Sequence, residues 1–177
     1  LETIYQLYED RDANIWISSS NGLFMFNPGK QIFSNLTNIR KGKDEFKNSV
    51  DAVLQSKSRI IYVSTWGAGI FAYDSNFNVV ANSLIPIAKD NNGLAGWDMH
   101  ERKNGEIWIA VQGGSIRIYN PKKNKATELK LSVFENKTVR QVIEDSIGNM
   151  WMGTQYGLII KCSNSNWHDT VNAFKIM

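Results

Sequence analysis

One cysteine and two histidines in 177 residues exclude several kinds of site. A single thiol, Cys162, cannot form an internal disulfide bond or a cysteine-rich metal site. His100 and His168 lie in different parts of the chain, whereas a metal site needs three or four converging ligands. No Ser-His-Asp set and no glycine-rich loop leading into a helix can be read. We therefore expect no metal, no cofactor and no catalytic activity.

Long apolar runs and a strong net charge are also lacking. The longest apolar run falls well short of the roughly 18 residues that a membrane helix needs, and no N-terminal signal segment is visible. The chain begins with Leu1, which indicates a fragment whose parent protein alone would provide any membrane attachment. With a net charge of +3, the lysines lie in short scattered groups. This distribution favours solvated loop charge over nucleic-acid contact.

What the sequence does contain is an internal repeat. Trp16, Tyr62, Trp108 and Trp151 follow one another at steps of 46, 46 and 43 residues. Each aromatic residue is flanked by two apolar residues and followed by a glycine (Gly22, Gly69, Gly114 and Gly157). Each copy also divides into four short apolar runs separated by turn residues. The predicted units are residues 3–36, 49–84, 94–131 and 138–177.

A repeat of this length with four short strands is typical of a β-propeller blade. No stretch shows a sustained helical period, so we expect an all-β fold with few or no helices. The repeated tryptophan would fill the wedge between neighbouring blades, because each blade buries its faces only against its neighbours. Four blades could close into a small ring. They could also form an open arc completed by further blades of a parent chain or by a second copy in a homodimer.

The most regular copy is Val139–Leu158, with the sequence VRQVIEDSIGNMWMGTQYGL. It resembles the two-component regulator propeller repeat, whose pattern runs roughly V-x-x-I-x-E-D-x-x-G-N-L-W-I-G-T-x-x-G-L. The other three copies are degenerate: Ala13 replaces the turn glycine of the first, and Tyr62 replaces the tryptophan of the second. The resemblance implies the periplasmic sensor region of a hybrid two-component system, which senses oligosaccharides. A histidine kinase elsewhere in the parent protein would carry the signal.

Two acidic pairs, Glu9-Asp10 and Glu144-Asp145, precede turns and could be read as a general acid and base. Adjacent strand residues point to opposite faces, so the two carboxylates cannot flank one bond. We expect them to stabilise turns. The layout is also similar to the Asp-box of sialidase propellers, but there the aspartate stands five residues before the tryptophan. Here it stands six before, which weakens a glycosidase interpretation.

Ligand candidates come from the end of each blade formed by the turns between its second and third strands and by the blade-to-blade connections. A carbohydrate site needs an aromatic plane for the sugar ring and amides or carboxylates for its hydroxyl groups. Trp66 and Trp97 depart from the repeat pattern and are the leading candidates, although both could simply fill gaps between blades. The other candidates are Asn21, Asp98, Gln112, Gln155 and Tyr156, together with Asp90, Asn91 and Asn92 in a connection.

Two classes of function remain open. The first is a non-catalytic periplasmic sensor segment that binds an oligosaccharide. The second is a propeller scaffold for protein–protein interaction or dimerisation, without a small-molecule site.

Overall fold

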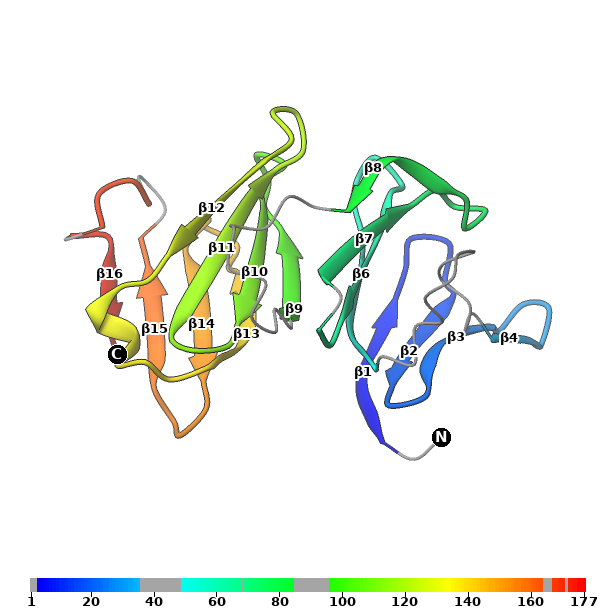
Figure 1. The fold of residues 1–177 in the computed structure, drawn as a ribbon, viewed down its shortest axis with the longest axis horizontal. Coiled ribbons are helices and arrows are strands. Elements are labelled where there is room, and N and C mark those ends of the chain that lie inside the picture. The colour runs from blue at the N-terminus through cyan, green and yellow to red at the C-terminus, as the bar shows by residue number, and fades with distance from the viewer. Residues whose placement is uncertain (1–2, 36–48, 68, 85–95, 164–166, 171) are drawn as a thin grey trace. The chain divides into compact units, whose positions relative to one another are not determined.

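The computed structural model describes residues 3–35, 49–67, 69–84, 96–163, 167–170 and 172–177. These residues form four antiparallel sheets, each of four strands in chain order, as Figure 1 shows for the sheet that starts at β13. The sheets are blades 1 to 4. The only helical element among the described residues is a single 3₁₀ turn, η1 (Ser132–Phe134). The predicted all-β propeller fold is confirmed.

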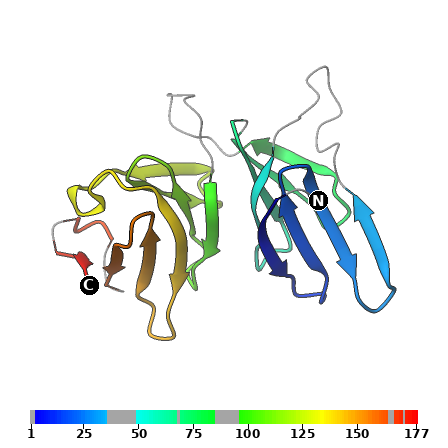
Figure 2. The same ribbon diagram turned by 90° about the horizontal axis from the view of Figure 1, so that it is seen from below.

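The strands of blades 1 and 2 form the first of two compact bodies into which the chain divides. Figure 2 shows the blade 1 strands from below. Blade 1 contains β1 (Ile4–Glu9), β2 (Ile15–Ser19), β3 (Gly22–Asn27) and β4 (Ile32–Asn35). Blade 2 contains β5 (Val50–Gln55), β6 (Ile61–Thr65), β7 (Gly69–Tyr73) and β8 (Val79–Leu84).

The strands of blades 3 and 4 form the second body, with η1 in the connection between the two blades. Blade 3 contains β9 (Gly96–Glu101), β10 (Ile107–Val111), β11 (Ser115–Asn120) and β12 (Lys125–Leu129). Blade 4 contains β13 (Val139–Glu144), β14 (Met150–Thr154), β15 (Ile159–Cys162) and β16 (Phe174–Ile176).

In each body an apolar cluster lies between the two blades. In the first body, Trp16 of blade 1 packs in one cluster with Val53 and Val63 of blade 2. In the second, Trp108 of blade 3 shares a cluster with Val142 and Met152 of blade 4. Trp16 and Trp108 therefore fill the wedge between blades, as the repeat predicts. Two facing apolar sheets bury this surface because neither blade could cover it alone.

The turn aspartates organise the first hairpin of blades 1 and 4. Asp10 accepts the indole N–H of Trp16 at 2.8 Å and the side-chain and backbone N–H groups of Asn14. Asp145 repeats this arrangement, with Trp151 at 2.8 Å and both N–H groups of Asn149. The expected turn role is thus confirmed for both aspartates. The hydrogen bond from Trp151 lowers the pKa of Asp145 to about 2, because it stabilises the carboxylate.

Gln55 ends β5 and Glu144 ends β13. Both side chains accept hydrogen bonds from the neighbouring blade rather than from their own turn. Gln55 accepts the backbone N–H of Arg11 from the β1–β2 turn at 3.1 Å. At the equivalent place in the second body, Glu144 accepts the backbone N–H of Lys103 at 2.8 Å. The prediction of a turn role was therefore wrong for Glu144. Its carboxylate reaches 41 residues back along the chain, which no local pattern reveals.

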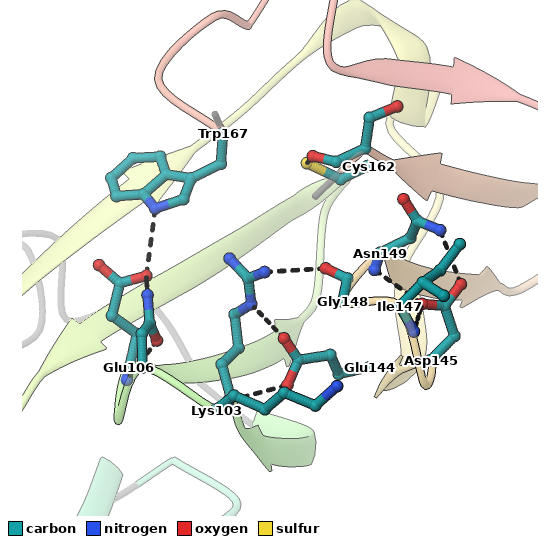
Figure 3. Close-up of polar contacts among 12 residues, drawn as sticks. Lys103, Glu106, Glu144, Asp145, Ile147, Gly148, Asn149, Cys162 and Trp167 are labelled. Atoms are coloured by element: carbon teal, nitrogen blue, oxygen red, sulfur yellow. Dashed lines mark hydrogen bonds and ion pairs between the residues drawn. The ribbon is translucent and has the colours of Figure 1, made fainter. Parts of the chain in front are cut away.

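Arg102 replaces the turn aspartate in blade 3 and strengthens the same interface through Glu144 and Gly148, which are labelled in Figure 3. Its Nε donates to Glu144 at 3.1 Å, and its guanidinium NH2 group donates to the carbonyl of Gly148 at 2.9 Å. The two side chains of this ion pair are only 9% and 4% exposed. The indole nitrogen of Trp108, which would need an aspartate here, meets no acceptor among the described residues.

Candidate functional site

The turns between the second and third strands close the same end of their blades. In three blades the first residue of this turn donates its backbone N–H to the residue just before the first strand. These bonds measure 2.8 to 3.0 Å and join Ser20 to Thr3, Trp66 to Ser49, and Gln155 to Thr138. The candidates on these turns therefore lie at the same end of their respective blades. This end is here called the turn end of a blade.

At the turn end of the first body, Asn21 and Trp66 are accessible. Asn21 is exposed, and its side-chain oxygen accepts the hydroxyl of Ser20 at 3.1 Å. The Trp66 side chain is 43% exposed, beside Gly67 at a φ of 78°. An indole that is nearly half exposed at a turn offers a planar apolar surface to a ligand.

At the turn end of the second body, Trp97, Arg140 and Gln155 form a cluster. The guanidinium carbon of Arg140 lies 3.7 Å from the ring centroid of Trp97. Arg140 also donates to the side-chain oxygen of Gln155 at 3.5 Å, a long hydrogen bond. Trp97 is half buried against the core between blades 3 and 4. One face of its ring is therefore covered by a cation, which holds a positive charge at this end of the body.

Tyr156 and Gln112 are the most open candidates of this body. Tyr156 is 82% exposed and adopts a left-handed φ of 68°. This backbone conformation is unusual for an aromatic residue. Tyr156 directly follows Gln155 in the turn. Gln112 is exposed in the corresponding turn of blade 3.

Asp98 is engaged in backbone hydrogen bonds. Its two carboxylate oxygens accept the N–H groups of Met99 and Val142, each at 2.9 Å. Burial raises the pKa of Asp98 to about 6, although these two hydrogen bonds act in the opposite direction. In this structure Asp98 joins blade 3 to blade 4.

Arg140 is the residue that the sequence interpretation missed. It stands one position before Gln141 in β13, where an exposed polar residue is ordinary in a strand. A signal was nevertheless present: Tyr5, Asp51, Trp97 and Arg140 occupy the same position of the four repeats. Because blades stack, residues at one repeat position can meet across an interface, as Trp97 and Arg140 do.

A cavity of about 220 Å³ lies at the opposite end of blades 3 and 4, where β10 begins. The indole N–H of Trp167 donates to the carboxylate of Glu106 at 3.2 Å (Figure 3). The ring of His168 lies against that of Trp167, with centroids 3.7 Å apart. The remaining lining residues are Ile118, Asn120, Lys123, Lys125 and Thr127.

In the part of the chain that the structure describes, no group of three or more His, Cys, Asp or Glu side chains could hold a metal ion. Cys162 is buried, and burial raises the pKa of its thiol to about 11. A neutral, buried thiol is a poor nucleophile. Asp90, Asn91 and Asn92 lie outside the described residues. No helix among the described residues is long and apolar enough to cross a membrane.

The sheets and their turn ends define a β-propeller segment built from a regular four-stranded repeat. Residues 134–156, which include all of β13 and β14, match the family model described as two component regulator propeller. The resemblance read from the sequence is therefore confirmed over this stretch. Among curated proteins, none matches the chain significantly.

Solved structures share the fold at low sequence identity. The extracellular domain of a putative hybrid two-component system from B. thetaiotaomicron superimposes with a TM-score of 0.70 at 17% identity, over 98% of this chain and 24% of that one. The corresponding domain of a second such system from this organism gives 0.72 at 21% identity, over 98% and 23%. The chain thus spans about a quarter of the length of these domains.

An enzyme has a similar fold. A catalytically inactive virginiamycin B lyase from Staphylococcus aureus, solved with quinupristin, gives a TM-score of 0.72 at 12% identity. That match covers 99% of this chain and 57% of the lyase. The fold alone therefore does not distinguish a sensor from an enzyme.

Proposed function

We propose that the chain is a non-catalytic sensor segment in the extracytoplasmic region of a hybrid two-component receptor, located in the periplasm. A histidine kinase elsewhere in the parent protein would transmit the signal. The observation that carries this proposal is the match of residues 134–156 to the two-component regulator propeller. The likeness of the whole fold to extracellular domains of hybrid two-component systems supports it.

The proposed ligand is an oligosaccharide bound at the turn ends. Two exposed aromatic rings, Trp66 and Tyr156, support this assignment, since a sugar ring stacks its C–H face on an aromatic plane. Amide groups for the hydroxyls are found on the same kind of turn, at Asn21 in the first body and at Gln155, directly before Tyr156, in the second. Trp97 is less suited to stacking, because Arg140 already covers one face of its ring. The positive charge of Arg140 favours an oligosaccharide that carries a carboxylate or a sulfate.

Calorimetric titration with a library of neutral and acidic oligosaccharides tests the proposal. We expect Trp66→Ala or Tyr156→Ala to weaken binding at least about tenfold, which corresponds to about 1.4 kcal/mol. Phe33→Ala is the matched control, because Phe33 is 58% exposed on an outer strand away from the turn end. A glycan that bound the wild-type chain and both turn-end variants equally well would contradict the site.

A scaffold for protein–protein interaction is the second candidate. The specific observation in its favour is the group of exposed large apolar side chains on blades 1 and 4, among them Leu7 and Ile143. Complete absence of binding across the oligosaccharide library would favour this role over the sensor.

A further inference from the structure

The cavity of about 220 Å³ in the second body lies where the apolar contact between blades 3 and 4 ends. Trp108 and Ile118 are paired in the sheet of blade 3 and belong to the apolar cluster that faces blade 4. Glu106 and Asn120 stand two residues further toward the strand ends. Because side chains alternate along a strand, they lie on the same face as Trp108 and Ile118. The cavity is therefore lined by a polar extension of the blade interface.

The polar side chains of this extension have different partners from those at the same repeat positions of blade 1. There, Asn14 and Asn27 form a hydrogen bond of 2.6 Å between their side chains. In blade 3, the side chain of Asn120 instead accepts the backbone N–H of Lys123 at 3.1 Å, within its own turn. Glu106 binds the connection of blade 4. One contact between neighbouring strands is thus replaced by two separate ones, with the cavity beside them.

The aromatic wall of the cavity comes from the connection between β15 and β16, residues 163–173. In Figure 3 the indole nitrogen of Trp167 points to Glu106, and it donates to Oε2 of that carboxylate at 3.2 Å. The ring of His168 lies against that of Trp167. Oε2 of Glu106 also accepts the side-chain N–H of Asn104 at 3.0 Å. Oε1 accepts no hydrogen bond from the residues that the structure describes, so it can accept one from a ligand.

Two lysines bring positive charge to the cavity. Lys123 belongs to the turn between β11 and β12, and Lys125 begins β12 in register with Asn120. Both are exposed and line the cavity, and neither ammonium group has an ion-pair partner in the described part of the chain. In blade 1 the register position of Lys125 is held by Ile32. Two cations against the single carboxylate of Glu106 favour an anionic ligand.

The size and composition of the lining select among anions. The volume is below the roughly 300–1,000 Å³ of pockets for drug-sized ligands, so the ligand has about one ring. A bare inorganic ion would leave the apolar surfaces of Trp167 and Ile118 without a contact. An aromatic acid would press an apolar edge against the carboxylate of Glu106. A hydroxylated ring can instead donate a hydroxyl group to Glu106 and exchange a hydrogen bond with the hydroxyl of Thr127.

We propose that this cavity binds an acidic monosaccharide unit. Its carboxylate faces Lys123 and Lys125, a hydroxyl group faces Glu106, and its ring lies beside Trp167. A free sugar acid and the terminal residue of a longer glycan share this chemistry. The cavity lies at the opposite end of the blades from the turn ends, so it is a second site. It does not rest on the proposed sensor function, because its residues differ from those of the turn ends.

NMR titration of the full, ¹⁵N-labelled chain with D-glucuronate tests the proposal. The reporter is the indole N–H of Trp167, assigned by its loss in Trp167→Phe. We expect its signal to shift saturably, because a ligand in the cavity perturbs the hydrogen bond to Glu106. D-glucose, which lacks the carboxylate, should bind at least about tenfold more weakly, because charge-assisted hydrogen bonds are lost. A disaccharide ending in glucuronate forms the second arm: a saturable shift with either acidic ligand supports the site, and their affinities separate the two sources.

Substitution of lysines provides the contrast. Lys123→Gln and Lys125→Gln should each weaken binding of D-glucuronate at least about tenfold, because each removes a charged donor from the cavity. Lys122→Gln is the matched control. It removes a charge from the same turn but not from the cavity lining, and should change the affinity less than about twofold, since solvent screens an exposed charge. All three variants should fold, because each side chain is exposed.

Three outcomes would overturn the proposal. The first is the absence of a saturable shift at the Trp167 indole with either acidic ligand. The second is equal affinity for D-glucuronate and D-glucose. The third is equal affinity of the Lys125→Gln and Lys122→Gln proteins. The sensor proposal is tested by Trp66→Ala and Tyr156→Ala at the turn ends, so the failure of one proposal is distinguishable from the failure of the other.

Discussion

Asp10 and Asp145 bind the indoles of Trp16 and Trp151 in blades 1 and 4. Blade 3 has Arg102 at the same repeat position, and its side chain has different partners. The carboxylates of blades 1 and 4 serve their own hairpin, whereas Arg102 reaches across to Glu144 and Gly148 of the next blade. Removing one partner of a buried ion pair strongly destabilises the folded protein, because the other charge remains buried without a partner. Arg102 thus exchanges a local turn contact for an interface contact.

Arg102→Ala should lower the free energy of unfolding of the second body by about 3 kcal/mol, as expected for one lost partner of a buried pair. Urea unfolding monitored by tryptophan fluorescence measures this change. The matched control is Asp12→Ala, which removes the ion pair between Asp12 and Arg59. The two side chains of that pair are 41% and 59% exposed, so its loss should cost less than about 1 kcal/mol. Equal losses in the two variants would show that the Arg102 pair does not stabilise the interface.

Asp98 should make stability depend on pH in the mildly acidic range. Its pKa of about 6 in the folded protein exceeds the ordinary value of 3.8, so between these values the folded state binds more protons than the unfolded state. The free energy of unfolding should therefore fall as the pH rises from about 4 to about 6, and this contribution should be constant above that range. The lowered pKa values of Asp10 and Asp145 act at lower pH and with the opposite sign.

Asp98→Asn tests this dependence, since the amide retains a side-chain acceptor, as Gln6 does at the equivalent position of blade 1. Thermal unfolding of the two proteins between pH 4 and 7 should show a smaller slope in the variant. Identical slopes would assign the pH dependence to other groups.

At the scale of elements, the hairpin between β10 and β11 depends on one of its two glycines. A Cβ atom at Gly114 would lie 2.4 Å from the Cα of Asn136, in the connection that leads into β13. A Cβ at Gly113 would meet no atom of the described residues within 4 Å. Both residues have a left-handed φ, of 75° and 80°, so backbone strain from alanine should be similar at the two positions.

Gly114→Ala should therefore destabilise the second body by about 3 kcal/mol, the sum of backbone strain and overpacking. Gly113→Ala should cost only the strain, about 1 kcal/mol. Chemical denaturation of the two variants provides the comparison. Similar values would mean that the connection moves away from Gly114 without cost.

Most elements were predictable because their signals are local. Alternation and turn residues predict strands at Ile4–Glu9, Gly22–Asn27, Val79–Leu84, Gly96–Glu101 and Ser115–Asn120, and the structure has all five at those bounds. Other strands begin or end one or two residues away, as at β12, which starts at Lys125 rather than Ala126. Element ends depend on hydrogen-bond register, to which alternation of side chains is insensitive. The 3₁₀ turn at Ser132–Phe134 was not predicted, since three residues carry no period.

At the scale of the molecule, stability comes from pairs of blades rather than from single blades. Each core joins the two blades of one body, and a blade alone would expose the apolar residues that line it. The proposed ligand site lies at the turn ends, where the sequence can vary without disturbing the stack.

The sequence by itself determined the repeat, the strand order, the turns and the fold class. The strands and turns depend on local alternation and turn residues, and the repetition of one pattern along the chain reinforces each assignment. Only the tertiary structure decided what each copy of a position contacts. Trp97 and Arg140 meet across an interface, Glu144 reaches back to Lys103, and Asp98 is held by Val142. These partners lie about 40 residues apart in the chain, and blade packing alone brings them together.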